Sequence, residues 1–241
     1  MDNLAATTAV ILAGGVGSRL RAVVSDRPKV LASIHNRPFL AYLLDMLEQA
    51  GIDEVVLSTG YMADLVEETF GSAFGRMRVG YSRESMPLGT GGALRAAIPR
   101  VRTELILAMN GDSFCEFDVH ALAAAHQARQ ARATILLTQV PDTQRFGRVR
   151  TGADDRMLAF EEKGAQAGPG WINAGVYLLE RRLLETLPEH RALSLEREVF
   201  PAWIGHGLYG FSAGGRFLDI GTPASFAQAE AFFFPAGKPR R

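Results

Sequence analysis

The sequence predicts an α/β fold with a mainly parallel sheet, because two hydrophobic periodicities alternate along its first half. Through the first 140 residues, short apolar runs rich in β-branched residues alternate with segments of helical spacing. Such strand–helix–strand units form parallel sheets with right-handed crossovers. No Ser/Gly/Pro-rich linker interrupts the 241 residues, so we expect one domain over residues 1–234.

The elements of the first half follow in a regular order. Residues 8–13 (TAVILA) predict a buried strand, and residues 38–50 predict a helix with Pro38 near its start and Gly51 after its end. Further strands are expected at 54–59, 77–82, 104–109 and 133–140, and helices at 62–70, about 90–98 and 118–131.

The pattern is looser in the second half. We expect strands at 146–151, 157–161, 171–179 and 207–212, and helices at 180–187, 194–200 and from 222 to about 234. This part should extend the same sheet and cap one end of it. Residues 235–241 (PAGKPRR) are expected to form a flexible tail.

Composition excludes several classes of function. Lys plus Arg and Asp plus Glu both number 26, so the net charge is zero and neither a nucleic acid nor an anionic membrane is an expected partner. The single cysteine, Cys115, cannot form an intramolecular disulfide, which suits a cytoplasmic protein. No signal-peptide pattern starts the chain, and no apolar run reaches the roughly 18 residues of a membrane span.

A glycine-rich loop, residues 12–20 (LAGGVGSRL), follows the first expected strand. Glycines at this place let backbone N–H groups approach phosphate oxygens. The loop is not a Walker loop, and it fails the dinucleotide fingerprint because Leu20 stands where the third glycine is needed. Arg19 and Lys29 could both bind phosphates. The alternative is a glycine turn with two exposed cations.

Two aspartates follow strand-like stretches: Asp112 comes after 104–109, and Asp219 after Phe217-Leu218. Side chains just past strand ends point into the crevice where open α/β sheets bind ligands. Two carboxylates together with phosphate oxygens and waters suit Mg²⁺. The alternatives are a turn or helix cap at Asp112 and a cap at Asp219 for the helix near Pro223.

These motifs resemble those of the sugar-1-phosphate nucleotidyltransferases. That family opens with L-A-G-G-x-G-[TS]-R-L and then P-K, matched here by residues 12–20 and 28–29. Nearly the whole chain follows the family order, through 88–94 (LGTGGAL), 110–112 (NGD), 146–147 (FG), 161–163 (EEK), 172–177 (INAGVY) and 219–223 (DIGTP). Ser18 replaces the usual Thr, and residues 22–27 (AVVSDR) replace a Pro-Leu-Thr linker. The variant linker is similar to that of the D-glycero-α-D-manno-heptose-1-phosphate guanylyltransferases.

The resemblance implies a Rossmann-like, three-layer α/β/α nucleotidyltransferase fold with a mixed, mainly parallel sheet. It also implies an enzyme that uses Mg²⁺ and transfers GMP from GTP to a sugar 1-phosphate. With D-glycero-α-D-manno-heptose 1-phosphate, the products would be GDP-heptose and pyrophosphate, for capsule or lipopolysaccharide biosynthesis. Mannose-1-phosphate guanylyltransferase, a uridylyltransferase and an inactive nucleotide-sugar-binding subunit are the alternatives. A homodimer is one option for the assembly.

The resemblance further assigns roles to individual residues. Arg19, Lys29, Asp112, Lys163 and Asp219 would be catalytic, with Asp112 and Asp219 as metal ligands. Lys163 would hold the sugar phosphate, and Glu162, Asn173 and Gly147 would contact the sugar. The nucleotide, bound by residues 1–140, would contact Leu12, Ala13, Gly14, Gly15, Gly17, Ser18, Arg19, Lys29, Glu84, Leu88, Gly89, Thr90, Asn110 and Gly111. Residues 141–234 would bind the sugar phosphate.

The chemistry needs no nucleophilic side chain, because a phosphate oxygen of the sugar 1-phosphate can attack the α-phosphorus of the nucleotide. Glu84 is expected to help select guanine as the base. A carboxylate only accepts hydrogen bonds, and guanine offers two adjacent donors. The alternative is that Glu84 is solvated and that backbone groups of Leu88 and Gly89 read the base.

Overall fold

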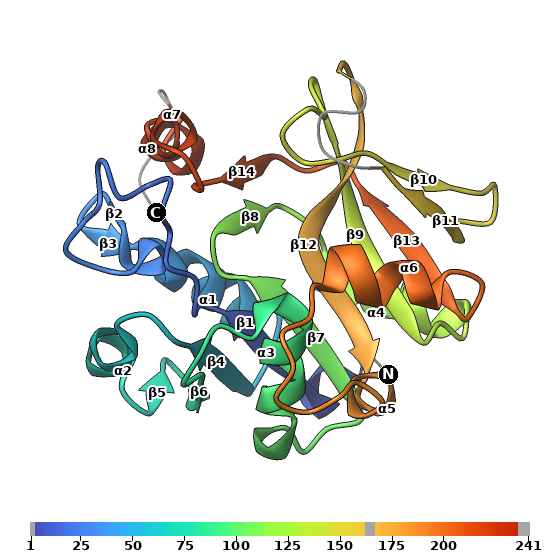
Figure 1. The fold of residues 1–241 in the computed structure, drawn as a ribbon, viewed down its shortest axis with the longest axis horizontal. Coiled ribbons are helices and arrows are strands. Elements are labelled where there is room, and N and C mark those ends of the chain that lie inside the picture. Colours follow the sequence, from blue (N-terminus) through green and yellow to red (C-terminus); the bar gives the residue numbers. More distant parts are fainter. Residues whose placement is uncertain (1–2, 162–166, 236–241) are drawn as a thin grey trace.

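The computed structural model describes residues 3–161 and 167–235 (Figure 1). Its centre is an eight-stranded sheet with strand order β13-β9-β12-β7-β1-β4-β6-β5. The bounds are β1 (Thr7–Leu12), β4 (Glu54–Thr59), β5 (Ala73–Phe74), β6 (Met77–Arg83), β7 (Leu105–Asn110), β9 (Ala133–Val140), β12 (Gly170–Glu180) and β13 (Leu208–Ala213). The neighbours β7, β1, β4 and β6 run parallel, as do β9 and β13, whereas β12 is antiparallel to both β7 and β9. The expected mixed, mainly parallel sheet is confirmed.

Helices cover both faces of this sheet (Figure 1). One face carries α1 (Phe39–Gln49), α2 (Ala63–Phe70) and α4 (Val119–Ala128), and the other carries α3 (Gly89–Ala97), α5 (Arg181–Glu185) and α6 (Phe200–Trp203). Side chains alternate along β1 as a strand requires: Ile11 packs in the cluster with α1, and Val10 in the cluster with α3. Both faces are therefore buried, which explains why the strands read as continuous apolar runs.

Some elements differ from those expected. The helix expected at 62–70 begins at Ala63, because Met62 has the left-handed backbone angle φ of 51°. The helix expected at 194–200 is a π-helical turn, η4 (Leu195–Val199), that leads into α6. The helix expected from 222 is two short helices, α7 (Pro223–Phe226) and α8 (Ala229–Phe233). The strand expected from 146 starts later, since the Phe146 and Gly147 N–H groups donate to the Thr143 carbonyl in a turn.

Several short elements complete the chain. They are the 3₁₀ turns η1 (Asn3–Ala6), η2 (Lys29–Leu31) and η3 (Ile98–Arg100), and the strand pairs β2 (Ser33–Ile34) with β3 (Arg37–Pro38), β8 (Ser113–Cys115) with β14 (Phe217–Asp219), and β10 (Val149–Thr151) with β11 (Met157–Phe160). The pairing of β8 with β14 matters most for function, because it places Asp219 directly opposite Ser113.

Strand register brings the ends of four parallel strands to one edge of the sheet. Leu12, the last residue of β1, pairs with Asn110 at the end of β7 and with Ser58 near the end of β4. Thr59 pairs with Arg83 at the end of β6. The glycine loop, the turn that carries Asp112 and the loop that carries Glu84 therefore leave the sheet side by side.

An aromatic cluster fixes the C-terminal helices to the body of the molecule. The ring of Phe233 stacks on Tyr42 with centroids 4.1 Å apart, and that of Phe232 lies edge-on to Phe114 at 5.9 Å. Among the described residues, no helix is long and apolar enough to cross a membrane. Of the tail expected at 235–241, only Pro235 is described.

Candidate active site

A cleft of about 660 Å³ opens at the edge of the sheet where β1 and β7 end. It receives side chains from both halves of the chain. Its lining consists of Arg19, Gly89, Thr90, Asn110, Asp112, Ser113, Phe146, Gly147, Arg148, Val149, Phe160, Glu161, Asn173, Ala174, Gly175, Ser194, Glu196, Arg197, Pro201, Phe217 and Asp219. Concave sites of this size with convergent polar groups are the usual form of a small-molecule site.

Eight of the residues predicted from the sequence line this cleft: Arg19, Gly89, Thr90, Asn110, Asp112, Gly147, Asn173 and Asp219. The other described candidates lie outside the lining of the cleft: Leu12, Ala13, Gly14, Gly15, Gly17, Ser18, Lys29, Glu84, Leu88 and Gly111. Glu84 directly follows β6, and Leu88 directly precedes α3. Glu162 and Lys163 lie outside the described residues.

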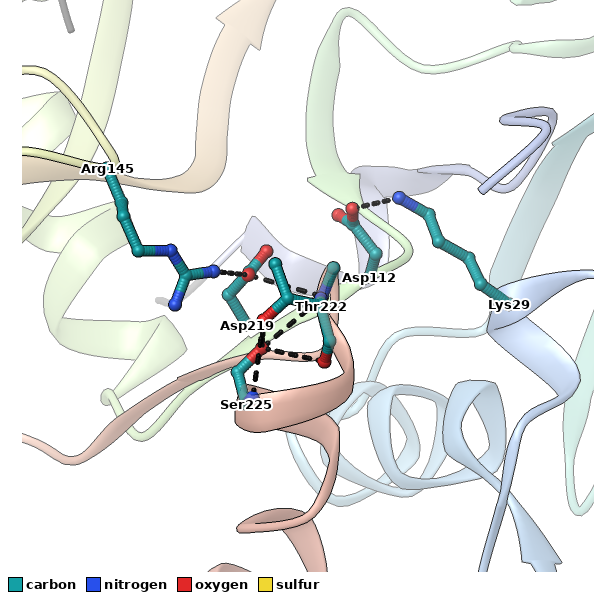
Figure 2. A network of polar contacts seen from close by, with 7 residues as sticks. Lys29, Asp112, Arg145, Asp219, Thr222 and Ser225 are labelled. Carbon is teal, nitrogen blue, oxygen red and sulfur yellow. Dashed lines mark hydrogen bonds and ion pairs between the residues drawn. The ribbon is translucent and has the colours of Figure 1, made fainter. Parts of the chain in front are cut away.

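The two aspartates lie between two cations (Figure 2). Lys29 Nζ forms an ion pair with Asp112 Oδ2, and Arg145 Nη2 lies 3.0 Å from Asp219 Oδ1. Asp219 Oδ1 also accepts a hydrogen bond from the Gly221 N–H at 3.2 Å. Among the described residues, Asp112 Oδ1 and Asp219 Oδ2 have no hydrogen-bond partner. Each carboxylate thus keeps one oxygen open.

The structure excludes the helix-cap alternatives for these aspartates, whereas Asp112 does lie in a turn between β7 and β8. The helix after Asp219 is capped by Thr222, whose Oγ1 accepts the Ser225 N–H at 3.3 Å while Ser225 Oγ accepts the Thr222 N–H at 3.3 Å (Figure 2). Asp112 is followed by the strand β8 and caps no helix. Neither carboxylate is needed as a cap.

Burial raises the pKa of Asp219, and the negative charge of Asp112 raises it further. Opposing this, the Gly221 N–H and the positive charges of Arg145 and Lys29 lower it. The two carboxylates are therefore close enough for the charge of one to oppose ionisation of the other. Neighbouring carboxylates of this kind are what a divalent cation would stabilise.

The donor set fits Mg²⁺, which prefers oxygen ligands and usually takes only one or two carboxylates from the protein. Asn110 lines the cleft, and its buried Oδ1 has no hydrogen-bond partner among the described residues. Such an orphaned acceptor beside Asp112 suits a metal-bound water or a ligand donor. No cluster of three or more His, Cys, Asp or Glu side chains occurs within residues 3–161 and 167–235 that could hold a metal ion by itself. A metal ion held by these two carboxylates would therefore need further oxygen ligands from water or a bound molecule.

The turn Asn110-Gly111-Asp112 needs its central glycine because its backbone lies directly against the end of β1. The Gly111 N–H donates to the Leu12 carbonyl at 2.9 Å, and a Cβ at this position would lie 2.7 Å from the same oxygen. Only glycine lets the Asp112 turn lie against the end of β1. The Ala13 N–H is also used, since it donates to the Ser58 carbonyl at 2.7 Å. Gly15, Val16, Ser18 and Arg19 are the exposed part of the glycine loop.

Glu84 follows β6 and is half-buried beside the glycine loop. Its Oε2 accepts the Leu88 N–H at 2.9 Å, and its Oε1 lies 3.4 Å from the Ser58 hydroxyl. Burial raises the pKa of Glu84 against the lowering effect of these two hydrogen bonds. Glu84 is thus a structured side chain that braces the Leu88–Thr90 segment, and it is not a freely solvated one.

A hydrogen-bonded network around Glu196 joins residues from both halves of the chain beside the cleft. Glu196 accepts from the hydroxyls of Tyr177 at 3.2 Å, Thr90 at 3.0 Å and Ser194 at 3.0 Å. Tyr177 is fully buried, and its hydroxyl accepts from Asn173 Nδ2 at 2.9 Å. Tyr177 therefore does not line the cleft and instead positions Asn173.

A bulge in β12 aims Asn173 at the site. The pairing of β12 with β9 is irregular between Asn173 and Tyr177, where Gly175 has φ of 75° and donates its N–H to Asn173 Oδ1 at 2.8 Å. A Cβ on Gly175 would lie 2.7 Å from Asn110 Nδ2, so a larger residue would push these strand ends apart.

Sequence reasoning missed Arg145, Glu196 and Arg197. A signal existed for Arg145, which directly precedes the Phe146-Gly147 motif. No pattern pointed to Glu196 or Arg197, since both lie in a segment expected to be an ordinary helix. Cys115 is buried, and burial raises its pKa to about 11, which agrees with the absence of a nucleophilic role.

Comparison with known proteins identifies the family. The family model described as nucleotidyl transferase matches residues 8–234. The D-glycero-α-D-manno-heptose 1-phosphate guanylyltransferase of Aneurinibacillus thermoaerophilus is 37% identical over 223 residues, which are 92% of this chain and 96% of that protein. The mannose-1-phosphate guanylyltransferase of Mycobacterium tuberculosis is also 37% identical, over 92% of this chain, but the match spans only 63% of that protein.

Solved structures agree with the sequence comparisons. HddC from Yersinia pseudotuberculosis is 31% identical and superposes with a TM-score of 0.84, covering 94% of this chain and 99% of that one. The same protein complexed with GMP-PN superposes with a TM-score of 0.83. The chain therefore belongs to the nucleotidyl transferase family and is, as its motifs predict, an enzyme of the sugar-1-phosphate nucleotidyltransferase type.

Proposed function

We propose that this enzyme transfers GMP from GTP to D-glycero-α-D-manno-heptose 1-phosphate, giving GDP-heptose and pyrophosphate for surface polysaccharide biosynthesis in the cytoplasm. The observation that carries the proposal is the convergence of Arg19, Asp112, Asn173 and Asp219 on one cleft. The guanine and heptose assignments rest on the relatives, two of which are named as heptose 1-phosphate guanylyltransferases, and on the structural neighbour complexed with GMP-PN.

In the proposed reaction, a phosphate oxygen of the sugar 1-phosphate attacks the α-phosphorus of GTP. The bond from that phosphorus to the bridging oxygen breaks, and pyrophosphate leaves with the electron pair. Arg19 and Lys29 would hold the triphosphate and the leaving pyrophosphate, and Lys163 would hold the attacking phosphate. Gly147, Asn173 and Glu162 would orient the sugar. Mg²⁺ held by Asp112 and Asp219 would neutralise phosphate charge.

For the base, we propose that Glu84 selects guanine. Both backbone groups of Leu88 are engaged, since its N–H donates to Glu84 and its carbonyl accepts from the Leu193 N–H at 2.8 Å. The Leu88 N–H is therefore not free to donate to a base. A carboxylate held in place by one backbone N–H and one hydroxyl keeps further lone pairs for the two donors of guanine.

Mannose 1-phosphate remains the second candidate substrate, because the mannose relative matches at the same identity as the heptose relative. A test is pyrophosphate release from a panel of GTP, ATP, UTP and dTTP with heptose 1-phosphate, mannose 1-phosphate and glucose 1-phosphate. We expect the highest kcat/KM for GTP with the heptose. A higher value for mannose 1-phosphate would replace the sugar, and a preference for UTP or dTTP would overturn the guanylyltransferase assignment.

A further inference from the structure

Arg145 is the charged residue at the metal carboxylates that no assigned role explains. It lies on the loop between β9 and β10, and its Nη2 is 3.0 Å from Asp219 Oδ1 (Figure 2). Lys29 makes the equivalent ion pair with Asp112. In the free protein, each of the two carboxylates thus has its own counter-cation, and the group of four side chains carries no net charge.

Local packing holds the guanidinium of Arg145 in place. The Arg145 Cζ lies 5.2 Å from the centroid of the Phe146 ring, and that ring meets Phe217 edge-on at 5.5 Å. Phe217 and Asp219 are both on β14. The contacts made by Arg145 and Phe146 therefore dock the loop on β14 beside the metal carboxylate.

The orientation of Asp219 does not depend on Arg145. The Gly221 N–H donates to Asp219 Oδ1, the Ile220 N–H donates to the Asp112 carbonyl at 2.9 Å, and Asp219 pairs with Ser113. The side chain of Asp219 is 19% exposed, whereas that of Arg145 is 47% exposed. Arg145 thus adds positive charge to a carboxylate whose position other contacts already fix.

We propose that Arg145 is a built-in counter-cation of the metal site, which holds one oxygen of Asp219 and keeps divalent cations weakly bound until they arrive with the nucleotide. The proposal rests on the function proposed above. A positive charge next to Asp219 repels a free divalent cation but attracts a metal–nucleoside triphosphate complex, whose net charge is negative. Arg145 thus acts on the metal through its positive charge and its ion pair with Asp219, and it does not set the orientation of Asp219.

The test is the affinity for Mn²⁺, measured by electron paramagnetic resonance, with and without a non-hydrolysable GTP analogue. In Arg145→Gln, we expect free Mn²⁺ to bind about tenfold more tightly, because one unit charge acts on a divalent ion in a site open to water. The Mn²⁺–analogue complex should bind severalfold more weakly in the same variant. Arg145→Lys keeps the charge and should stay within about threefold of wild type in both measurements.

A matched control is Arg132→Gln, which removes an arginine of the same exposure (48%) from an ion pair with Glu180. It should change neither affinity, and circular dichroism should show that all variants are folded. The proposal is overturned if Asp219→Asn abolishes Mn²⁺ binding but Arg145→Gln binds free Mn²⁺ no more tightly than the wild type does. If Mn²⁺ binding is insensitive to Asp219→Asn as well, the metal position in the proposed function is itself wrong, and the role of Arg145 falls with it.

Discussion

The network around Glu196 gives the most direct test of how the two halves of the cleft are joined. The proposed change is Glu196→Gln, which preserves the size of the side chain but replaces one carboxylate oxygen by an N–H₂ group. Three hydroxyls, from Tyr177, Thr90 and Ser194, donate to the carboxylate in the native protein. An amide offers one acceptor oxygen, so it cannot accept from both sides of the network.

The expected cost follows from these contacts. If the amide oxygen faces Thr90 and Ser194, the fully buried hydroxyl of Tyr177 loses its acceptor, at a cost of about 1–3 kcal/mol. The remaining two hydrogen bonds change from charged to neutral, which costs a further ~1 kcal/mol in total. We expect the free energy of unfolding to fall by about 3 kcal/mol, and the melting temperature by roughly 6–12 °C for a chain of this length.

The assay is urea unfolding followed by circular dichroism, combined with a double-mutant cycle with Tyr177→Phe. Removing the hydroxyl also removes the orphaned donor, so the double variant should be at least ~1 kcal/mol more stable than the sum of the single effects predicts. The control is Glu198→Gln, an exposed neighbour that accepts the Ser194 N–H at 3.0 Å, with an expected cost below about 1 kcal/mol. A Glu196→Gln variant as stable as wild type, or an additive cycle, would refute the reasoning.

Four further predictions concern single residues. Asp112→Asn should keep the fold but lose most of its turnover, measured as pyrophosphate release. In a separate test, near-normal activity of the wild-type enzyme in the presence of a chelator would exclude the metal assignment. Lys163→Ala should reduce kcat/KM for the sugar 1-phosphate by the equivalent of roughly 3–4 kcal/mol, whereas GTP binding, measured by calorimetry, should be retained. If the variant binds GTP weakly but keeps a normal turnover number, Lys163 belongs to the nucleotide site. Glu84→Gln should reduce the preference for GTP over UTP and dTTP in a competition assay, and an unchanged profile would exclude Glu84 as the base reader. Burial lowers the pKa of His126 to about 4, so the unfolded chain binds a proton below pH 6.5 that the folded protein does not. Stability should therefore fall as the pH drops toward 4, with about 2 kcal/mol lost between pH 7.5 and 5 from this group, and His126→Gln should remove that part of the decline in urea unfolding.

The sequence alone was sufficient for the elements whose signals are local. The apolar run at residues 8–13 and the helical spacing at 38–50 correspond to β1 and α1, because the periodicity of buried side chains is set within a few residues. The position of Asp112 just past a strand also followed from local order along the chain. The family motifs added residue roles that periodicity cannot supply.

Other features arise from pairings between distant segments, which no local pattern encodes. Insertion of β12 between β7 and β9 carries Asn173 to the cleft, and the pairing of β14 with β8 brings Asp219 next to Asp112 across more than 100 residues. The ion pair of Arg145 and the network of Glu196 exist only once these strands have paired. The sequence by itself determined most of the strands and helices of the first half and placed a glycine-rich loop after the first strand, because those depend on residue type and spacing. Only the tertiary structure decided which charges face one another, because strand register and loop docking set the distances between them.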